Sequence, residues 1–119
     1  MIIVDTSIWI DHVRQSSLRL VGLLNATQVM VHPFVIGEIA LGTLKNRKAV
    51  LDGLAGMPQA PVGTLAEVFA FIETAKLAGS GIGYVDAHLL ASARLAGALV
   101  WTRDKPLAAA AHKLGLVFA

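Results

Sequence analysis

The chain contains no cysteine and no long apolar run. Without cysteine, a disulfide framework and a thiolate metal site are both excluded. No apolar stretch approaches the roughly 18 to 20 residues that a membrane-spanning helix needs, so we expect no membrane segment. Charged side chains interrupt the N-terminal apolar stretch and no basic segment precedes it, which argues against a signal peptide. We therefore predict a cytoplasmic protein.

Charged residues are also scarce, at 15% of the chain, whereas hydrophobic residues make up 55%. This balance excludes a disordered chain and is typical of a densely packed globular fold. A length of 119 residues allows one proper core, so we predict a single domain over residues 1–119. The high apolar share indicates that some apolar surface stays exposed until a partner covers it, which favours a homo-oligomer.

Short apolar runs without polar alternation predict strands that are buried on both faces. They lie at IIV (2–4), VMV (29–31), APV (60–62), ALVW (98–101) and LVF (116–118). Helical spacing separates them and predicts helices over residues 7–15, 17–25, 34–44, 47–54, 64–79, 84–97 and 104–115, the fifth with a capping pair in Thr64 and Glu67. The alternation predicts an α/β fold of three αβα layers, with a mainly parallel central sheet of about four to five strands.

Four of the eight acidic residues fall at strand ends or in the first turns of helices: Asp5, Glu38, Asp86 and Asp104. Open parallel sheets place their ligands at the carboxyl ends of the strands, so these four side chains could share one edge. Each also has an ordinary interpretation, because Asp is a common helix cap and its charge suits a helix N-terminus. Glu38 fits that interpretation least well, since its neighbours are apolar and a buried Glu without a partner is costly.

Four carboxylates gathered at one edge would repel one another by roughly 4 kcal/mol per close pair at an effective dielectric near 20. A bound cation would relieve this repulsion, and hard divalent ions such as Mg²⁺ and Mn²⁺ prefer oxygen ligands. Ser7 and Thr102 stand two residues from Asp5 and Asp104, so their hydroxyls could orient the carboxylates, although Ser7 could equally cap the first helix. The four histidines lack a zinc-site spacing and are expected to have packing or surface roles.

The charge balance supports this division of the acids. With those four assigned to a site, the other four acids face ten Lys and Arg residues, which leaves +6 on the rest of the chain. A basic body around an acidic pocket suits a protein that binds a polyanion while it holds a cation.

Four segments, DTSIWI, GEIALG, GYVDAHLLASA and WTRDKPLAAAA, resemble in order the PIN domain and, more narrowly, the VapC toxins of bacterial toxin–antitoxin pairs. The resemblance covers essentially the whole chain. It implies a PIN-like fold and an endoribonuclease that depends on Mg²⁺, with Mn²⁺ as the alternative ion. It also implies that Asp5, Glu38, Asp86 and Asp104 are the catalytic metal ligands, with support from Ser7 and Thr102.

The same resemblance implies an RNA substrate, a VapB-like antitoxin and a homodimer. By sequence, Arg103 and Lys105 are the nearest candidates for RNA contacts, followed by Arg14, Arg19 and the LKNRK run (44–48). Trp9 and Trp101 lie in apolar patterns that favour core packing over base stacking. The apolar helices around residues 9–24 and 34–44 could form an antitoxin groove or a dimer face.

Two alternatives follow from the same residues. A receiver-like signalling domain needs a second acid beside the first and a lysine after the last strand, and Asp5 has no acidic neighbour before Asp11. The stronger alternative is a PIN-like module that has lost activity and only binds RNA or protein. The presence of all four acids favours the enzyme.

Overall fold

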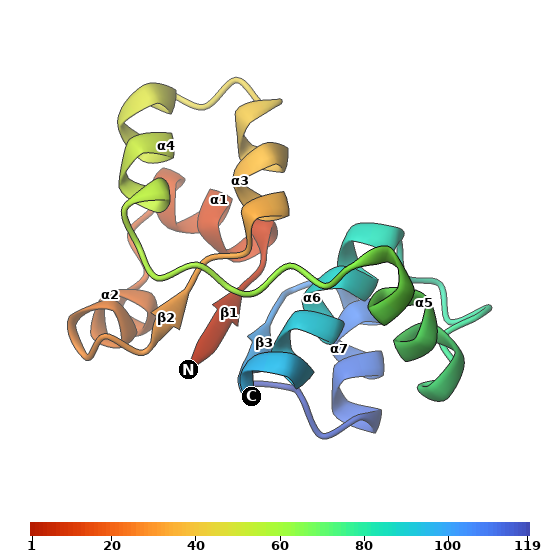
Figure 1. Ribbon diagram of the computed structural model, residues 1–119. Coiled ribbons are helices and arrows are strands. Elements are labelled where there is room, and N and C mark those ends of the chain that lie inside the picture. Colours follow the sequence, from red (N-terminus) through yellow and green to blue (C-terminus); the bar gives the residue numbers. More distant parts are fainter.

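The computed structural model describes residues 1–119 and contains a parallel sheet of three short strands (Figure 1). The strands are β1 (Ile2–Val4), β2 (Val29–Met30) and β3 (Leu99–Trp101), in the order β2-β1-β3. Ile3 of the central strand pairs with Met30 on one side and Val100 on the other. Parallel neighbours need crossover connections, and helices supply them on both sides of this sheet.

Our expectation of four to five strands was too high. The two additional runs each form only one parallel bridge, Val31 with Gln59 and Val100 with Val117. Both bridges sit at an outer edge of the sheet, beyond β2 and β3. Pro58 and Pro61 flank the first bridge, and proline cannot donate to a ladder of hydrogen bonds, so this segment pairs at a single point. The two additional runs therefore lie beside the sheet as predicted, but each pairs with it through one bridge and does not form a strand.

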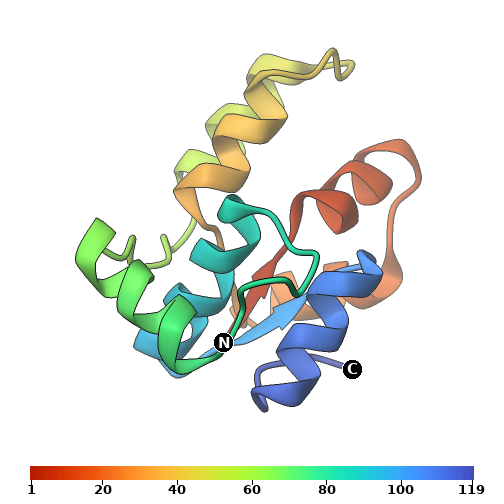
Figure 2. The same ribbon diagram turned by 90° about the vertical axis from the view of Figure 1, so that its right-hand side faces the viewer.

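Seven helices surround the sheet. Their bounds are α1 (Thr6–Arg14), α2 (Leu18–Asn25), α3 (Pro33–Ala40), α4 (Arg47–Ala55), α5 (Leu65–Thr74), α6 (Tyr84–Ala96) and α7 (Lys105–Lys113). Figure 2 shows α3 and α4 as a hairpin that stands away from the sheet. None of the seven is both long enough and apolar enough to serve as a transmembrane segment.

Two helices end earlier than their sequence patterns predict. Helix α3 ends at Ala40 rather than at residue 44, and the guanidinium of Arg47 donates two hydrogen bonds, of 2.9 and 2.7 Å, to the Ala40 carbonyl. That contact satisfies one of the carbonyls that a helix C-terminus leaves free. Helix α5 ends at Thr74 rather than at residue 79, and Lys76 beyond it has a left-handed φ of 54°. The predicted capping pair of Thr64 and Glu67 is confirmed.

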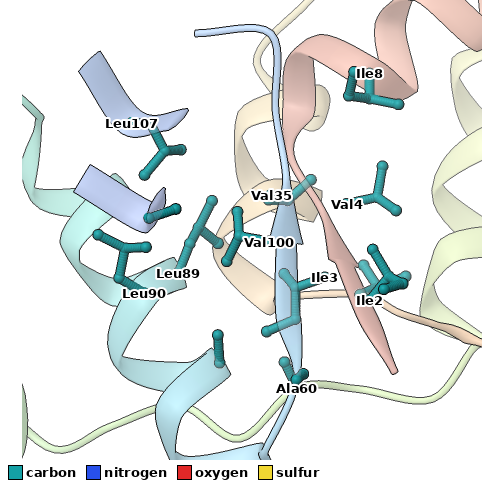
Figure 3. Close-up of a cluster of buried hydrophobic side chains, with 14 of the residues drawn as sticks. Ile2, Ile3, Val4, Ile8, Val35, Ala60, Leu89, Leu90, Val100 and Leu107 are labelled. Atoms are coloured by element: carbon teal, nitrogen blue, oxygen red, sulfur yellow. The ribbon is translucent and has the colours of Figure 1, made fainter. Parts of the chain in front are cut away.

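The core lies against the strands and the helices that pack on them (Figure 3). Leu89 and Leu90 of α6 and Leu107 of α7 lie on one side of Val100, whereas Ile8 of α1 lies near Val4 on the other. Each of these side chains is buried, which explains why the strands carry apolar residues at every position.

Both tryptophans and His32 behave as packing groups. Trp9 is buried, and Trp101 is half-buried with its ring centroid 5.6 Å from that of Phe118. His32 is fully buried; its Nδ1 accepts the Phe34 amide at 3.0 Å, and its Nε2 lies 3.0 Å from the Ser92 hydroxyl. Burial, followed by the charge of His88, lowers the pKa of His32 to about 4, so this ring is neutral at physiological pH.

Strands β1 and β3 end at the same edge of the sheet. The amide of Asp5, the first residue after β1, donates to the carbonyl of Trp101, the last residue of β3, at 2.9 Å. Helix α3 begins three residues after β2, at the same end of that strand. The carboxyl ends of parallel strands thus bring together segments that lie far apart in the sequence.

Candidate active site

Asp5 is the buried centre of the site, with 6% of its surface exposed. Its Oδ1 accepts the backbone amide of Thr6 at 2.8 Å, so it caps α1 as its position predicted. Its Oδ2 accepts two hydroxyl groups, from Thr102 at 2.7 Å and from Ser7 at 3.1 Å. Three donors therefore hold the orientation of this carboxylate.

The same two hydroxyls fasten the loop between β3 and α7. The Thr102 hydroxyl accepts the amide of Asp104 at 3.0 Å, and the Ser7 hydroxyl accepts the amide of Arg103 at 3.2 Å. Each hydroxyl therefore donates to Asp5 and accepts from the loop that carries Asp104. Asp104 itself caps α7 through Oδ2, which accepts the Leu107 amide at 3.0 Å. Its Oδ1 makes no hydrogen bond within the chain.

Glu38 extends from α3 to the same place, but its surroundings differ from what the sequence suggests. Its apolar neighbours indicated burial, whereas its side chain is exposed, because Val35 and Ile39 occupy the inner face of α3. The hydroxyl of Thr6 donates to Glu38 Oε1 at 2.7 Å. This contact joins α1 to α3, and sequence reasoning missed it; the position of Thr6 directly after Asp5 is the only local signal.

Asp86 lies in the first turn of α6 and is half-buried. Burial, followed by the charge of Asp5, raises the pKa of Asp86 to about 6. The charges of Asp104 and Glu38 raise the pKa further, and a hydrogen bond from the Gly83 backbone lowers it in part. The other three acids predicted for the site thus each act on the pKa of Asp86, although the four come from separate segments of the chain.

The arrangement is a loose cluster and not a finished coordination shell. No three acidic or histidine side chains stand close enough together, as oriented, to enclose a metal ion. Charges act on the pKa of Asp86 over longer distances than direct ligation spans, so the raised pKa does not require a preformed metal site. The available donors are oxygen atoms, which suit hard divalent cations. The donor chemistry therefore fits such an ion, and binding would require the side chains to move closer together than they lie in this structure.

The basic residues nearest in sequence divide into two kinds. Arg103 forms a two-point ion pair with Asp11, with Nε 2.6 Å from Oδ2 and Nη2 3.1 Å from Oδ1. Its guanidinium therefore contacts α1 through Asp11, a partner that sequence reasoning missed, and its contact with RNA stays a prediction. Lys105 is exposed and forms neither an ion pair nor a side-chain hydrogen bond.

The sequence also matches a known family. The family model of the PIN domain matches residues 2–113. Ribonuclease VapC32 of Mycobacterium tuberculosis, found in two strains, is 49% identical over 120 residues, covering 100% of this chain and 97% of its own length.

Solved structures agree with that match. FitAcB from Neisseria gonorrhoeae superposes with a TM-score of 0.62 at 26% identity, covering 94% of each chain. FitAB bound to an IR36 DNA fragment gives a TM-score of 0.62 at 23% identity, covering 94% of this chain and 91% of its own, and this likeness concerns the fold. The chain belongs to the PIN-domain family and, within it, to the VapC-type proteins.

Proposed function

We propose that residues 1–119 form one PIN domain that acts as an endoribonuclease toxin of a type II toxin–antitoxin pair and depends on Mg²⁺ or Mn²⁺. The observation that carries this proposal is the hydrogen-bonded arrangement at the sheet edge. Thr102 donates to Asp5 and accepts from the amide of Asp104, and Thr6, directly after Asp5, donates to Glu38. The name of the 49% identical relative, a ribonuclease, supports the reaction class.

In this proposal Asp5, Glu38, Asp86 and Asp104 hold the ion. A divalent cation held there supplies two effects: it lowers the pKa of a water molecule, and it stabilises the charge that develops on the scissile phosphate. Ser7 and Thr102 keep Asp5 and the loop of Asp104 in register through their hydroxyls. The hydroxyl of Thr6 holds the carboxylate of Glu38 through its hydrogen bond to Oε1. The chain itself needs no nucleophilic side chain, and it contains no cysteine.

The purified chain, freed of any partner, should cleave single-stranded RNA with Mg²⁺ or Mn²⁺ and leave 5′-phosphate and 3′-hydroxyl ends. An excess of chelator should stop the reaction, and added metal should restore it, because the ion supplies several kcal/mol of transition-state stabilisation. Gel analysis of end-labelled RNA measures both the rate and the product ends. Cleavage that continues at full rate in chelator would contradict the proposal.

Two apolar surfaces fit the partners that we propose. A groove of about 400 Å³ between α1, α2 and α4 is lined by Trp9, Val13, Leu24, Val50 and Leu54, among others, and suits an apolar segment of the VapB-like antitoxin. Apolar side chains also stand exposed on α5 and α6: Leu65, Phe69, Tyr84 and Leu95. We assign this second face to a homodimer, because adjoining exposed apolar side chains mark a surface that a protein partner covers.

Substitutions on the two surfaces should have opposite effects. Phe69→Glu should give the mass of a monomer and still bind antitoxin, whereas Val50→Glu should keep the dimer and lose the antitoxin. Light scattering on the chain alone, and on the chain co-expressed with the product of any small open reading frame overlapping its gene, measures both results. If Phe69→Glu leaves the dimer intact, or if Val50→Glu still forms the complex, the corresponding assignment is wrong.

A further inference from the structure

A groove of about 570 Å³ lies between α1 and the segment that runs from α3 to α4. Glu38 lines it, so the groove adjoins the carboxylate cluster. Two exposed cations, Arg14 from α1 and Lys45 from the loop before α4, line it as well. Ile10, Val13 and Leu44 give part of the groove an apolar surface.

Contacts within the chain separate the basic residues into engaged and free ones. Five are held by other groups: Arg19 by the rings of Trp101 and Phe118, Arg47 by the Ala40 carbonyl, Lys48 by Asp52, Arg94 by the Phe71 ring and the Leu114 carbonyl, and Arg103 by Asp11. The remaining cations form neither ion pairs nor side-chain hydrogen bonds: Arg14, Lys45, Lys76, Lys105 and Lys113.

The position of the free cations distinguishes them further. Lys76 and Lys113 line a different pocket of about 390 Å³, between the end of α5 and α7, and none of the four acids lines that pocket. Lys105 lines neither of these two pockets. Arg14 and Lys45 are therefore the two free cations that share a groove with an acid of the cluster.

We propose that this groove binds the sugar–phosphate backbone of single-stranded RNA beside the scissile bond, with Arg14 and Lys45 contacting phosphates. The inference rests on the proposed ribonuclease function and adds the path of the substrate. Charge complementarity supports it, since unpaired cations bind phosphates by releasing counterions. The groove is also continuous with Glu38, so a strand lying in it would lead to the carboxylates. The apolar part of the groove suits contact with sugars and bases.

The experiment compares two double variants that each remove two free cations. Arg14→Gln/Lys45→Gln changes the groove, and Lys76→Gln/Lys113→Gln changes the other pocket. Binding of a fluorescent single-stranded RNA is measured by anisotropy over a range of salt concentrations, with chelator present so that no cleavage occurs. Cleavage with Mn²⁺ is then measured separately to obtain KM and kcat. Thermal melts check that both variants remain folded.

The groove variant should weaken RNA binding by about tenfold and reduce the slope of log affinity against log salt by about 1.4, since each phosphate contact contributes about 0.7 for a single strand. Its KM should rise while its kcat changes little. The Lys76/Lys113 variant should keep the wild-type slope.

Equal slopes in both variants, together with normal cleavage by the wild-type chain, would overturn the groove assignment alone. Wild-type protein that neither binds nor cleaves RNA would overturn the proposed function as well. If the groove variant keeps its RNA slope but loses affinity for the antitoxin, the groove receives an acidic protein segment and our assignment is wrong.

Discussion

Replacing Asp5 by Asn should reduce RNA cleavage by about 10³-fold or more, because several kcal/mol of metal-dependent stabilisation would be lost and each 1.36 kcal/mol is tenfold in rate. The side chain is buried and accepts three hydrogen bonds, from the Thr6 amide and from the hydroxyls of Ser7 and Thr102. Asn is nearly the same shape, but its amide nitrogen cannot accept the hydrogen bonds that a carboxylate oxygen accepts. The ion would lose a charged ligand, and the loop of Asp104 would lose part of its anchor.

The variant should still fold, because the two hydroxyls can rotate to suit a changed partner. We expect a loss of about 1 kcal/mol in the free energy of unfolding, as is typical for a hydrogen bond to a buried group. Circular dichroism and a thermal melt measure the fold, and end-labelled RNA measures cleavage. Asp52→Asn is the matched control, since Asp52 pairs only with Lys48 on the exposed face of α4. Cleavage within about tenfold of wild type would contradict the role of Asp5.

Replacing Asp86 by Asn should also abolish cleavage, yet it should stabilise the metal-free protein at neutral pH. The pKa of Asp86 is raised from 3.8 to about 6 by burial and by the three neighbouring carboxylates. The folded state therefore takes up a proton more readily than the unfolded state. Stability contributed by this group is greatest below about pH 4, declines as pH rises through about 6, and remains low above it.

Asparagine carries no charge, so the cost at neutral pH disappears in the variant. The shift corresponds to about 3 kcal/mol at most, but Asp86 is only half-buried and solvent screens its charge, so we expect about 1 kcal/mol. That amounts to a rise of about 4 °C in Tm for a domain of this size. The difference between variant and wild type should vanish near pH 4, where Asp86 is protonated in the folded wild-type chain.

Metal should reverse the order of stability. Mn²⁺ should raise the Tm of the wild-type chain, because a ligand that binds only the folded state stabilises it, and should raise that of Asp86→Asn much less. Melts at pH 4 and pH 7.5, with chelator and with Mn²⁺, measure both effects. If the variant in chelator melts below wild type at pH 7.5, the charge of Asp86 does not destabilise the metal-free protein. If Mn²⁺ stabilises both proteins equally, Asp86 is not a ligand.

Much of the fold could be predicted from local patterns. The strands IIV and ALVW, the caps at Asp5, Thr64 and Asp104, and the alternation of strands with helices depend on neighbouring residues only. The extent of the sheet was predicted less well. The run near Ala60 pairs with Val31 at a single bridge, because Pro58 and Pro61 flank the pairing residue, and the prediction of a strand over residues 60–62 did not take these prolines into account.

The candidate site also combines features that the sequence predicted with features that it did not. The positions of the four acids after strands or early in helices predicted a shared edge. Hydrogen bonds that link Asp5 to the loop of Asp104, and Thr6 to Glu38, support that prediction for three of them. The role of Arg103 was not predictable, because its partner Asp11 lies 92 positions away. The exposure of Glu38 was missed because apolar neighbours on a helix describe its inner face, and residue 38 falls on the outer one.

The sequence by itself determined the donors that this protein can offer an ion: carboxylates placed after strands or early in helices, and no thiolates. These are properties of residue types and short spacings. Only the tertiary structure decided which hydroxyl holds which carboxylate, and which cations remain free beside them. Those outcomes depend on distances between groups up to 97 positions apart, such as Thr102 and Asp5, and the packing of helices against the sheet sets them.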